Sequence, residues 1–84
     1  MPEPRIEDQL KTMIVDRLML PAKPGDIGDD DDLIKKWNVE SVQLMEIVIG
    51  LEELFGLTLD DEDFSIKKFR TVKNIAGVVR EKKG

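Results

Sequence analysis

The chain has 84 residues, enough for one domain spanning residues 1–84 with a modest core. It contains neither cysteine nor histidine. This excludes disulfides and thiolate metal sites, and it removes the usual general base and the commonest metal ligand.

The net charge of −5 is unevenly distributed. Residues 1–65 contain 17 acidic and 6 basic side chains, whereas residues 66–84 contain 7 basic and 1 acidic. An acidic body disfavours nucleic acid and favours partners with basic docking patches. We expect the basic segment to solvate the last helix and offset acidic repulsion. Because no apolar run is long enough to span a membrane and no signal-peptide pattern begins the chain, we expect a soluble, cytoplasmic monomer.

The first element is a predicted helix over residues 3–20. Apolar side chains recur there at helical spacing, at Ile6, Leu10, Met13, Ile14 and Leu18. Pro4 suits a first helical turn, and Pro21 predicts the end of the helix because the residue before a proline avoids the α region.

Residues 21–40 predict a long loop, because prolines and glycines interrupt its first half. Four consecutive carboxylates follow, from Asp29 to Asp32, but the glycine and glutamate of an EF-hand loop are missing. We therefore predict a solvated acidic loop and no metal site, with weak binding of a divalent ion by the carboxylates as the alternative. Leu33, Ile34 and Trp37 are the expected anchors to the core.

A second helix is predicted from Ser41 to Phe55, with Gly56 as its C-cap. The expected core stripe is Leu44, Ile47, Val48, Leu51, Leu54 and Phe55. The opposite face contains Val42, Glu46, Ile49 and Glu53. The two glutamates suit a surface, whereas the two aliphatic side chains indicate either ordinary surface or a docking surface. Gly50 lies in mid-helix, where it permits the close approach of a partner or of another backbone.

Residues 57–59 predict an extended linker, and the acidic run 60–63 suits the start of a short helix III. Phe64 and either Ile66 or Phe69 are its expected anchors. Thr71 is a suitable N-cap for a last helix, whose expected buried face is Val72, Ile75, Ala76 and Val79. The predicted fold is all-α, a four-helix bundle with three main helices, one short helix III and a long first loop.

Catalysis needs a set of reactive side chains that converge on one site, and the residue types of this chain do not supply one. We therefore do not expect an enzyme. Ser41 is the remaining candidate for chemistry. A serine at a helix start is either a helix cap or a hydroxyl that another enzyme modifies, and a helix N-terminus favours an attached phosphate. Spacing alone leaves both interpretations open.

The motif Val39-Glu40-Ser41-Val42, followed by the aliphatic and acidic run from Leu44 to Phe55, resembles the acyl carrier protein family. The resemblance extends over nearly the whole chain, including the acidic loop and the Phe69-Arg70-Thr71-Val72 segment before the last helix. It implies that Ser41 carries covalent 4′-phosphopantetheine, attached by a phosphopantetheinyl transferase.

The resemblance also implies the roles of other residues. Those matching partner contacts are Glu40, Val42, Glu46, Ile49, Glu52 and Glu53. Those suited to line an acyl pocket are Met13, Leu44, Val48 and Leu51, whose alternative role is core packing. The implied partners are enzymes with basic docking patches that load, modify or transfer acyl groups.

The implied function is an acyl carrier that holds acyl intermediates as thioesters for fatty-acid or related lipid or polyketide biosynthesis. The alternatives are an aminoacyl or peptidyl carrier, including the D-alanyl type, and a helical adaptor without a prosthetic group. Gln43, the Lys35-Lys36-Trp37-Asn38 segment and the basic C-terminal part depart from the common pattern of the family. These departures favour a specialised carrier.

Overall fold

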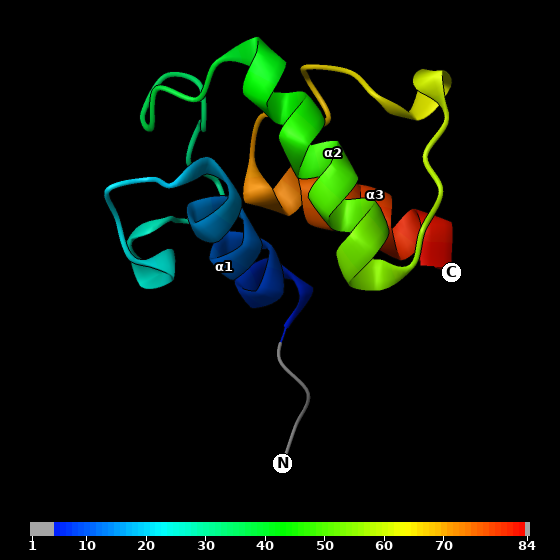
Figure 1. Ribbon diagram of the computed structural model, residues 1–84, viewed down its shortest axis with the longest axis horizontal. Helices are drawn as coiled ribbons and strands as arrows, with labels where there is room; N and C mark the ends of the chain where they lie inside the picture. The colour runs from blue at the N-terminus through cyan, green and yellow to red at the C-terminus, as the bar shows by residue number, and fades with distance from the viewer. Residues whose placement is uncertain (1–4, 84) are drawn as a thin grey trace.

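The computed structural model describes residues 5–83, which contain three α-helices and no strand. They are α1 (Ile6–Leu18), α2 (Ser41–Phe55) and α3 (Val72–Lys83). In Figure 1, α2 crosses in front of α3, and α1 lies beside them. The all-α class is confirmed. No helix in this part of the chain has the length and apolar character needed to cross a membrane.

The first helix is shorter than predicted. It ends at Leu18 because Met19 adopts a left-handed conformation, with φ of 53°. The backbone N–H of Leu20 then donates to the carbonyl of Val15 at 3.1 Å, which closes the helix before Pro21 is reached. The predicted range 3–20 was therefore too long at its C-terminal end. Residues 3 and 4, including Pro4 in the predicted first turn, lie outside the described residues.

The core lies where the three helices meet. Most of the predicted core positions of α2 and α3 are buried. Leu54 is an error in the prediction, because it is 44 % exposed, and Phe55 is only half-buried. The loop contributes two buried side chains that were not expected, Ile27 and Val39. The fully buried side chains are Leu10, Ile14, Leu33, Leu44, Ile47, Leu51, Phe69, Val72, Ile75, Ala76 and Val79.

The predicted short helix III is not confirmed. Residues 57–71 instead contain a 3-10 turn, η2 (Asp61–Asp63), and a single hydrogen-bonded turn that brings the Phe69 N–H within 3.1 Å of the Ser65 carbonyl. Phe69 is the buried anchor and stacks on Phe64 with their ring centroids 5.3 Å apart, whereas Ile66 is exposed. The aromatic pair fixes this connection without a regular helix.

The first loop is long, but backbone bonds tie it to α3. It contains a 3-10 turn, η1 (Pro24–Asp26). Leu33 is buried, as predicted, and its N–H donates to the Arg70 carbonyl at 2.9 Å. The Lys73 N–H donates to the Asp29 carbonyl at 2.9 Å. These bonds fix the loop against the start of α3, where Thr71 accepts the Asn74 N–H at 3.1 Å and caps the helix as predicted.

The acidic run of this loop is held by basic side chains from elsewhere in the chain. Lys11 lies 2.7 Å from Asp29 Oδ1 and Arg5 hydrogen-bonds to Oδ2, and both cations lower the pKa of the Asp29 carboxyl. The backbone N–H of Lys35 and then Arg70, which lies 2.6 Å from the carboxylate, lower the pKa of Asp32.

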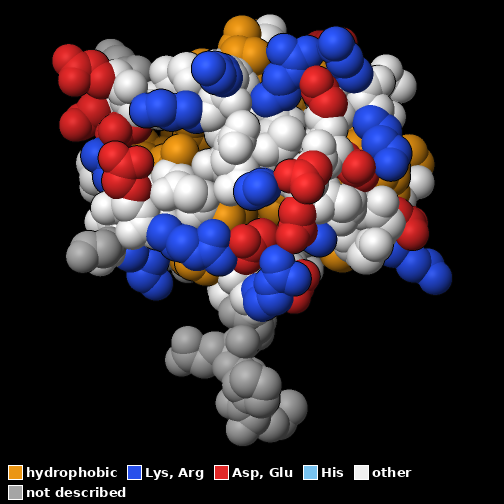
Figure 2. Space-filling view, turned by 180° about the vertical axis from the view of Figure 1, so that it is seen from behind, with side chains coloured by type: hydrophobic (Ala, Val, Ile, Leu, Met, Phe, Trp, Pro, Cys, Tyr) orange, Lys and Arg blue, Asp and Glu red, His pale blue; other side chains and the backbone are white. Residues whose placement is uncertain are grey.

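The basic C-terminal segment pairs with acidic groups in the same way. Seen from the side opposite to Figure 1, acidic and basic side chains alternate over the surface (Figure 2). Arg80 binds both oxygens of Glu7 at 2.9 Å, and Lys82 lies 2.7 Å from Asp63. The two charge blocks of the sequence therefore meet in ion pairs. Residues 5–83 contain no group of three or more acidic side chains arranged to hold a metal ion.

Gly50 brings α1 and α2 into close contact. A Cβ atom on Gly50 would lie only 2.5 Å from Met13 Sδ and 3.0 Å from Arg17 Nε. Real Cβ atoms do not approach a heavy atom so closely, so any larger residue would displace these side chains. The sequence left open whether Gly50 admits a partner or another part of the chain, and the structure shows that it admits α1.

Two mid-helix glycines provide a matched test of this contact. Gly77 on α3 has open space where a Cβ would lie. Gly77→Ala should raise the free energy of unfolding by about 0.5–1 kcal/mol through helix propensity. Gly50→Ala has the same gain in helix propensity. Its free energy of unfolding should nevertheless be about 1–2 kcal/mol lower than that of Gly77→Ala, because the Met13 and Arg17 side chains must move. Urea unfolding followed by circular dichroism measures both, and equal stabilisation by the two substitutions would contradict the contact.

Candidate functional site

Ser41 is the first residue of α2 and is exposed, but it does not cap the helix. The N-cap residue is Glu40, whose backbone N–H donates to Gln43 Oε1 at 2.8 Å. The Gln43 N–H donates in turn to the Glu40 carbonyl at 2.9 Å. The capping role considered for Ser41 is therefore wrong, because Glu40 occupies the N-cap position and Ser41 is already the first residue of the helix. Ser41 is exposed there.

The backbone before Ser41 is held from the interior. Val39 is buried, and its N–H donates to the Leu33 carbonyl at 3.0 Å. Asn38 has a left-handed conformation, with φ of 56°, which asparagine tolerates better than most residues. Leu33 is itself bonded to the start of α3, so the core positions the helix start that presents Ser41.

The outer face of α2 exposes aliphatic side chains beside carboxylates. Val42 is 70 % exposed and Ile49 42 %, and both glutamates predicted for this face are exposed. Met45 is also exposed and was not predicted, although its position three residues after Val42 puts it on the same side. We call this surface the docking face, and it consists of Val42, Met45, Glu46, Ile49 and Glu53.

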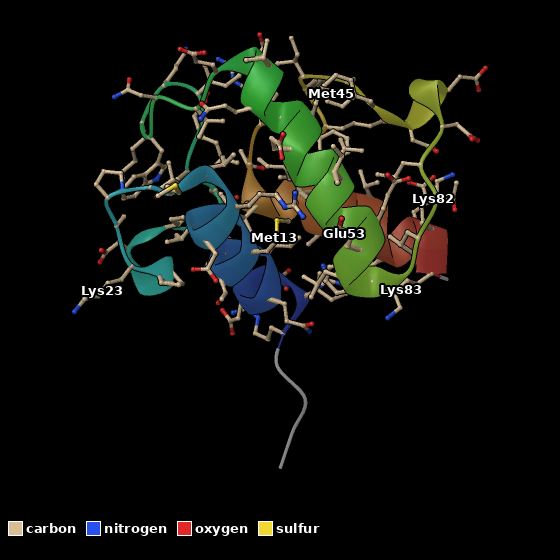
Figure 3. All side chains as sticks on the ribbon, in the orientation of Figure 1. Met13, Lys23, Met45, Glu53, Lys82 and Lys83 are labelled. Atoms are coloured by element: carbon tan, nitrogen blue, oxygen red, sulfur yellow. The ribbon has the colours of Figure 1, made fainter. Side chains whose placement is uncertain are left out.

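Arg17 of α1 reaches across to the two carboxylates of the docking face. Its Nη1 lies 3.3 Å from Glu46 Oε2, and its Nη2 lies 2.6 Å from Glu53 Oε2. Met13 and Glu53 lie on facing sides of α1 and α2 (Figure 3). The sequence analysis missed Arg17, because its role depends on how α1 and α2 are packed and no local pattern indicates that.

Two further residues expected at the docking face lie apart from it. Glu40 is exposed and precedes the helix next to Ser41. Glu52 is half-buried, and its Oε2 accepts the Leu59 N–H at 2.9 Å. Glu52 therefore holds the connection after α2.

Of the four residues expected to line an acyl pocket, only Met13 lines the cavity beside α1. Met13 is half-buried and lines a cavity of about 420 Å³ together with Leu54 and polar residues of α1. Leu44, Val48 and Leu51 do not line that cavity and are packed in the core. Their present role is to hold the helices together.

Comparison with known proteins agrees with this geometry. A family model described as "Phosphopantetheine attachment site" matches residues 8–79. The chain is 31 % identical to the acyl carrier protein of Chlamydia trachomatis serovar D, over 92 % of this chain and 95 % of that protein. It is 32 % identical to the acyl carrier protein of Chlamydia trachomatis serovar L2, over 90 % and 94 %. It is 29 % identical to that of Chlamydia felis, over 94 % and 96 %.

The two isoleucines of α2 test which face is exposed. Ile49→Glu should leave helical content and melting temperature nearly unchanged, because its side chain already meets solvent. Ile47→Glu should destabilise the protein by about 3 kcal/mol or more, because Ile47 is fully buried and a charge there has no partner. Thermal unfolding by circular dichroism separates the two, and unfolding by Ile49→Glu would show that the docking face belongs to the core.

Proposed function

Because the chain belongs to the acyl carrier protein family, whose 4′-phosphopantetheine is bound covalently to a serine, we propose that Ser41 is the attachment residue. The sequence contains one other serine, Ser65. The Ser65 hydroxyl accepts the Lys68 N–H at 3.1 Å within a turn, whereas Ser41 is exposed at the start of a long helix. The exposure of Ser41, with Glu40 in the N-cap position instead, is the observation that carries the proposal.

The start of α2 suits the phosphate of the arm. The first backbone N–H groups of a helix lack partners inside the helix, and the helix dipole favours negative charge near them. Gln43 satisfies the Glu40 N–H, which precedes the helix. A phosphodiester on the Ser41 oxygen would therefore lie beside the N–H groups of the first turn.

The arm ends in a thiol, which forms thioesters with acyl groups and supplies a nucleophile that this cysteine-free chain lacks. The protein's own residues bind the partner enzymes and deliver the acyl group to them. Val39 and Leu33 fix the start of α2, and the docking face presents aliphatic and acidic groups to enzymes with basic patches. We propose a cytoplasmic carrier for fatty-acid or related lipid or polyketide biosynthesis. Gln43 and the Lys35-Lys36 pair support a specialised one.

Shelter of the acyl chain is a second part of the proposal. Leu44, Val48 and Leu51 belong to the aliphatic core, and Met13 is packed against that core at its edge. An acyl chain entering beside Met13 would exchange core contacts for contacts of the same chemical kind. The helices would have to separate to admit it, because Leu44, Val48 and Leu51 are buried in the core and do not line the cavity that Met13 borders.

Intact-mass measurement tests the attachment residue. The protein is incubated with coenzyme A and a promiscuous phosphopantetheinyl transferase. The wild-type protein and Ser65→Ala should each gain the mass of one phosphopantetheinyl group, and Ser41→Ala should gain none. No gain by the wild type, or a gain that persists in Ser41→Ala, would overturn the proposal.

A further inference from the structure

We propose that Arg17 is a specificity-determining residue of the docking face, where it competes with the basic side chains of partner enzymes. This inference rests on the proposed function, in which enzymes with basic patches bind that face. Arg17 makes the same contacts with Glu46 and Glu53 that a partner's arginine or lysine would make. A partner that needs these carboxylates must therefore displace it.

The geometry makes Arg17 an effective competitor. Its guanidinium spans two carboxylates that lie seven residues apart on α2, with Nη1 3.3 Å from Glu46 and Nη2 2.6 Å from Glu53. An arginine fork holds two acceptors at once with little loss of freedom per bond. Only 27 % of the Arg17 side chain is exposed, against 52 % for Glu46 and 67 % for Glu53. The cation is therefore the more sheltered member of the cluster.

The space for this arginine is created by Gly50, which lies between the two glutamates on α2. A Cβ there would approach Arg17 Nε to 3.0 Å, so the side chain lies directly over the glycine backbone. Met13, one helical turn earlier on α1, is packed into the same gap. The arginine is thus held by packing as well as by charge, which distinguishes it from a mobile surface ion pair.

The contact divides the docking face into two parts. Near Ser41, Val42 and Met45 are exposed and available for apolar contact. Farther along α2, part of the negative charge of Glu46 and Glu53 is already neutralised. Partners that rely on apolar contact near Ser41 are favoured over partners that rely on basic residues opposite the two glutamates.

Steady-state kinetics of loading by the same promiscuous phosphopantetheinyl transferase tests the inference. Arg17→Gln should lower the KM for the apo-protein about three- to fivefold with kcat unchanged, because both carboxylates become available. Arg5→Gln is the matched control. It removes the same charge from the N-terminal side of α1, where Arg5 pairs with Glu7 and Asp29, and it should leave the KM near the wild-type value.

A second pair of variants identifies the carboxylates concerned. Glu53→Gln should raise the KM only slightly in the wild-type background and should remove most of the gain in the Arg17→Gln background. Equal KM values for Arg17→Gln and Arg5→Gln would overturn the inference while leaving Ser41 as the loading site. Loss of loading in every variant, or loading without Ser41, would instead overturn the proposed function.

If Arg17→Gln does not fold, Arg17→Lys decides. The single ammonium of lysine cannot bind both carboxylates as the arginine fork does, so the KM of this variant should fall below the wild-type value. An unchanged KM would overturn the inference.

Discussion

The close approach of α1 to α2 over Gly50 is the constraint on which the rest of the structure depends. A Cβ at that position would crowd the Met13 and Arg17 side chains, which fill the space beside the glycine. With the helices this close, Leu10 and Ile14 of α1 are fully buried against the apolar stripe of α2. The same approach brings Arg17 within reach of Glu46 and Glu53. One contact therefore joins the closure of the core to the charge of the outer face of α2.

The long loop depends on charge pairing as much as on burial. Its acidic run alone would repel itself, but Lys11, Arg70 and Lys73 each lie beside one of its carboxylates. These cations come from α1 and from the start of α3, so the loop is fixed at both sides of the molecule. The loop in turn ends at Val39, whose burial positions the first turn of α2. The exposed Ser41 is thus presented by a backbone held through buried and hydrogen-bonded neighbours, although it lies next to a 22-residue connection, residues 19–40.

Periodicity and residue type were sufficient to predict α2. The bounds of α2, its C-cap at Gly56 and the exposure of Val42 and Ile49 all follow from spacing and residue type. The end of α1 could not be predicted in this way, because Met19 adopts a left-handed conformation that its residue type disfavours.

The errors at the candidate site have the same kind of cause. Leu54 lies at the edge of the apolar stripe, and only the position of α1 decides that it is exposed. Ser41 has the residue type of a cap, but the N-cap position is taken by Glu40, whose N–H is bonded by Gln43. Arg17 takes part in the docking face through contacts with two residues that lie 29 and 36 positions later in the sequence. No local pattern encodes such contacts.

The claim that one contact joins the fold to the docking face is tested most directly by a double-mutant cycle between Arg17 and Glu53. The free energy of unfolding is measured for the wild type, Arg17→Gln, Glu53→Gln and the double variant. The account predicts a favourable coupling of about 0.5–1 kcal/mol, since the ion pair is short and its arginine is held by packing. Additive effects of the two substitutions, within about 0.3 kcal/mol, would contradict it.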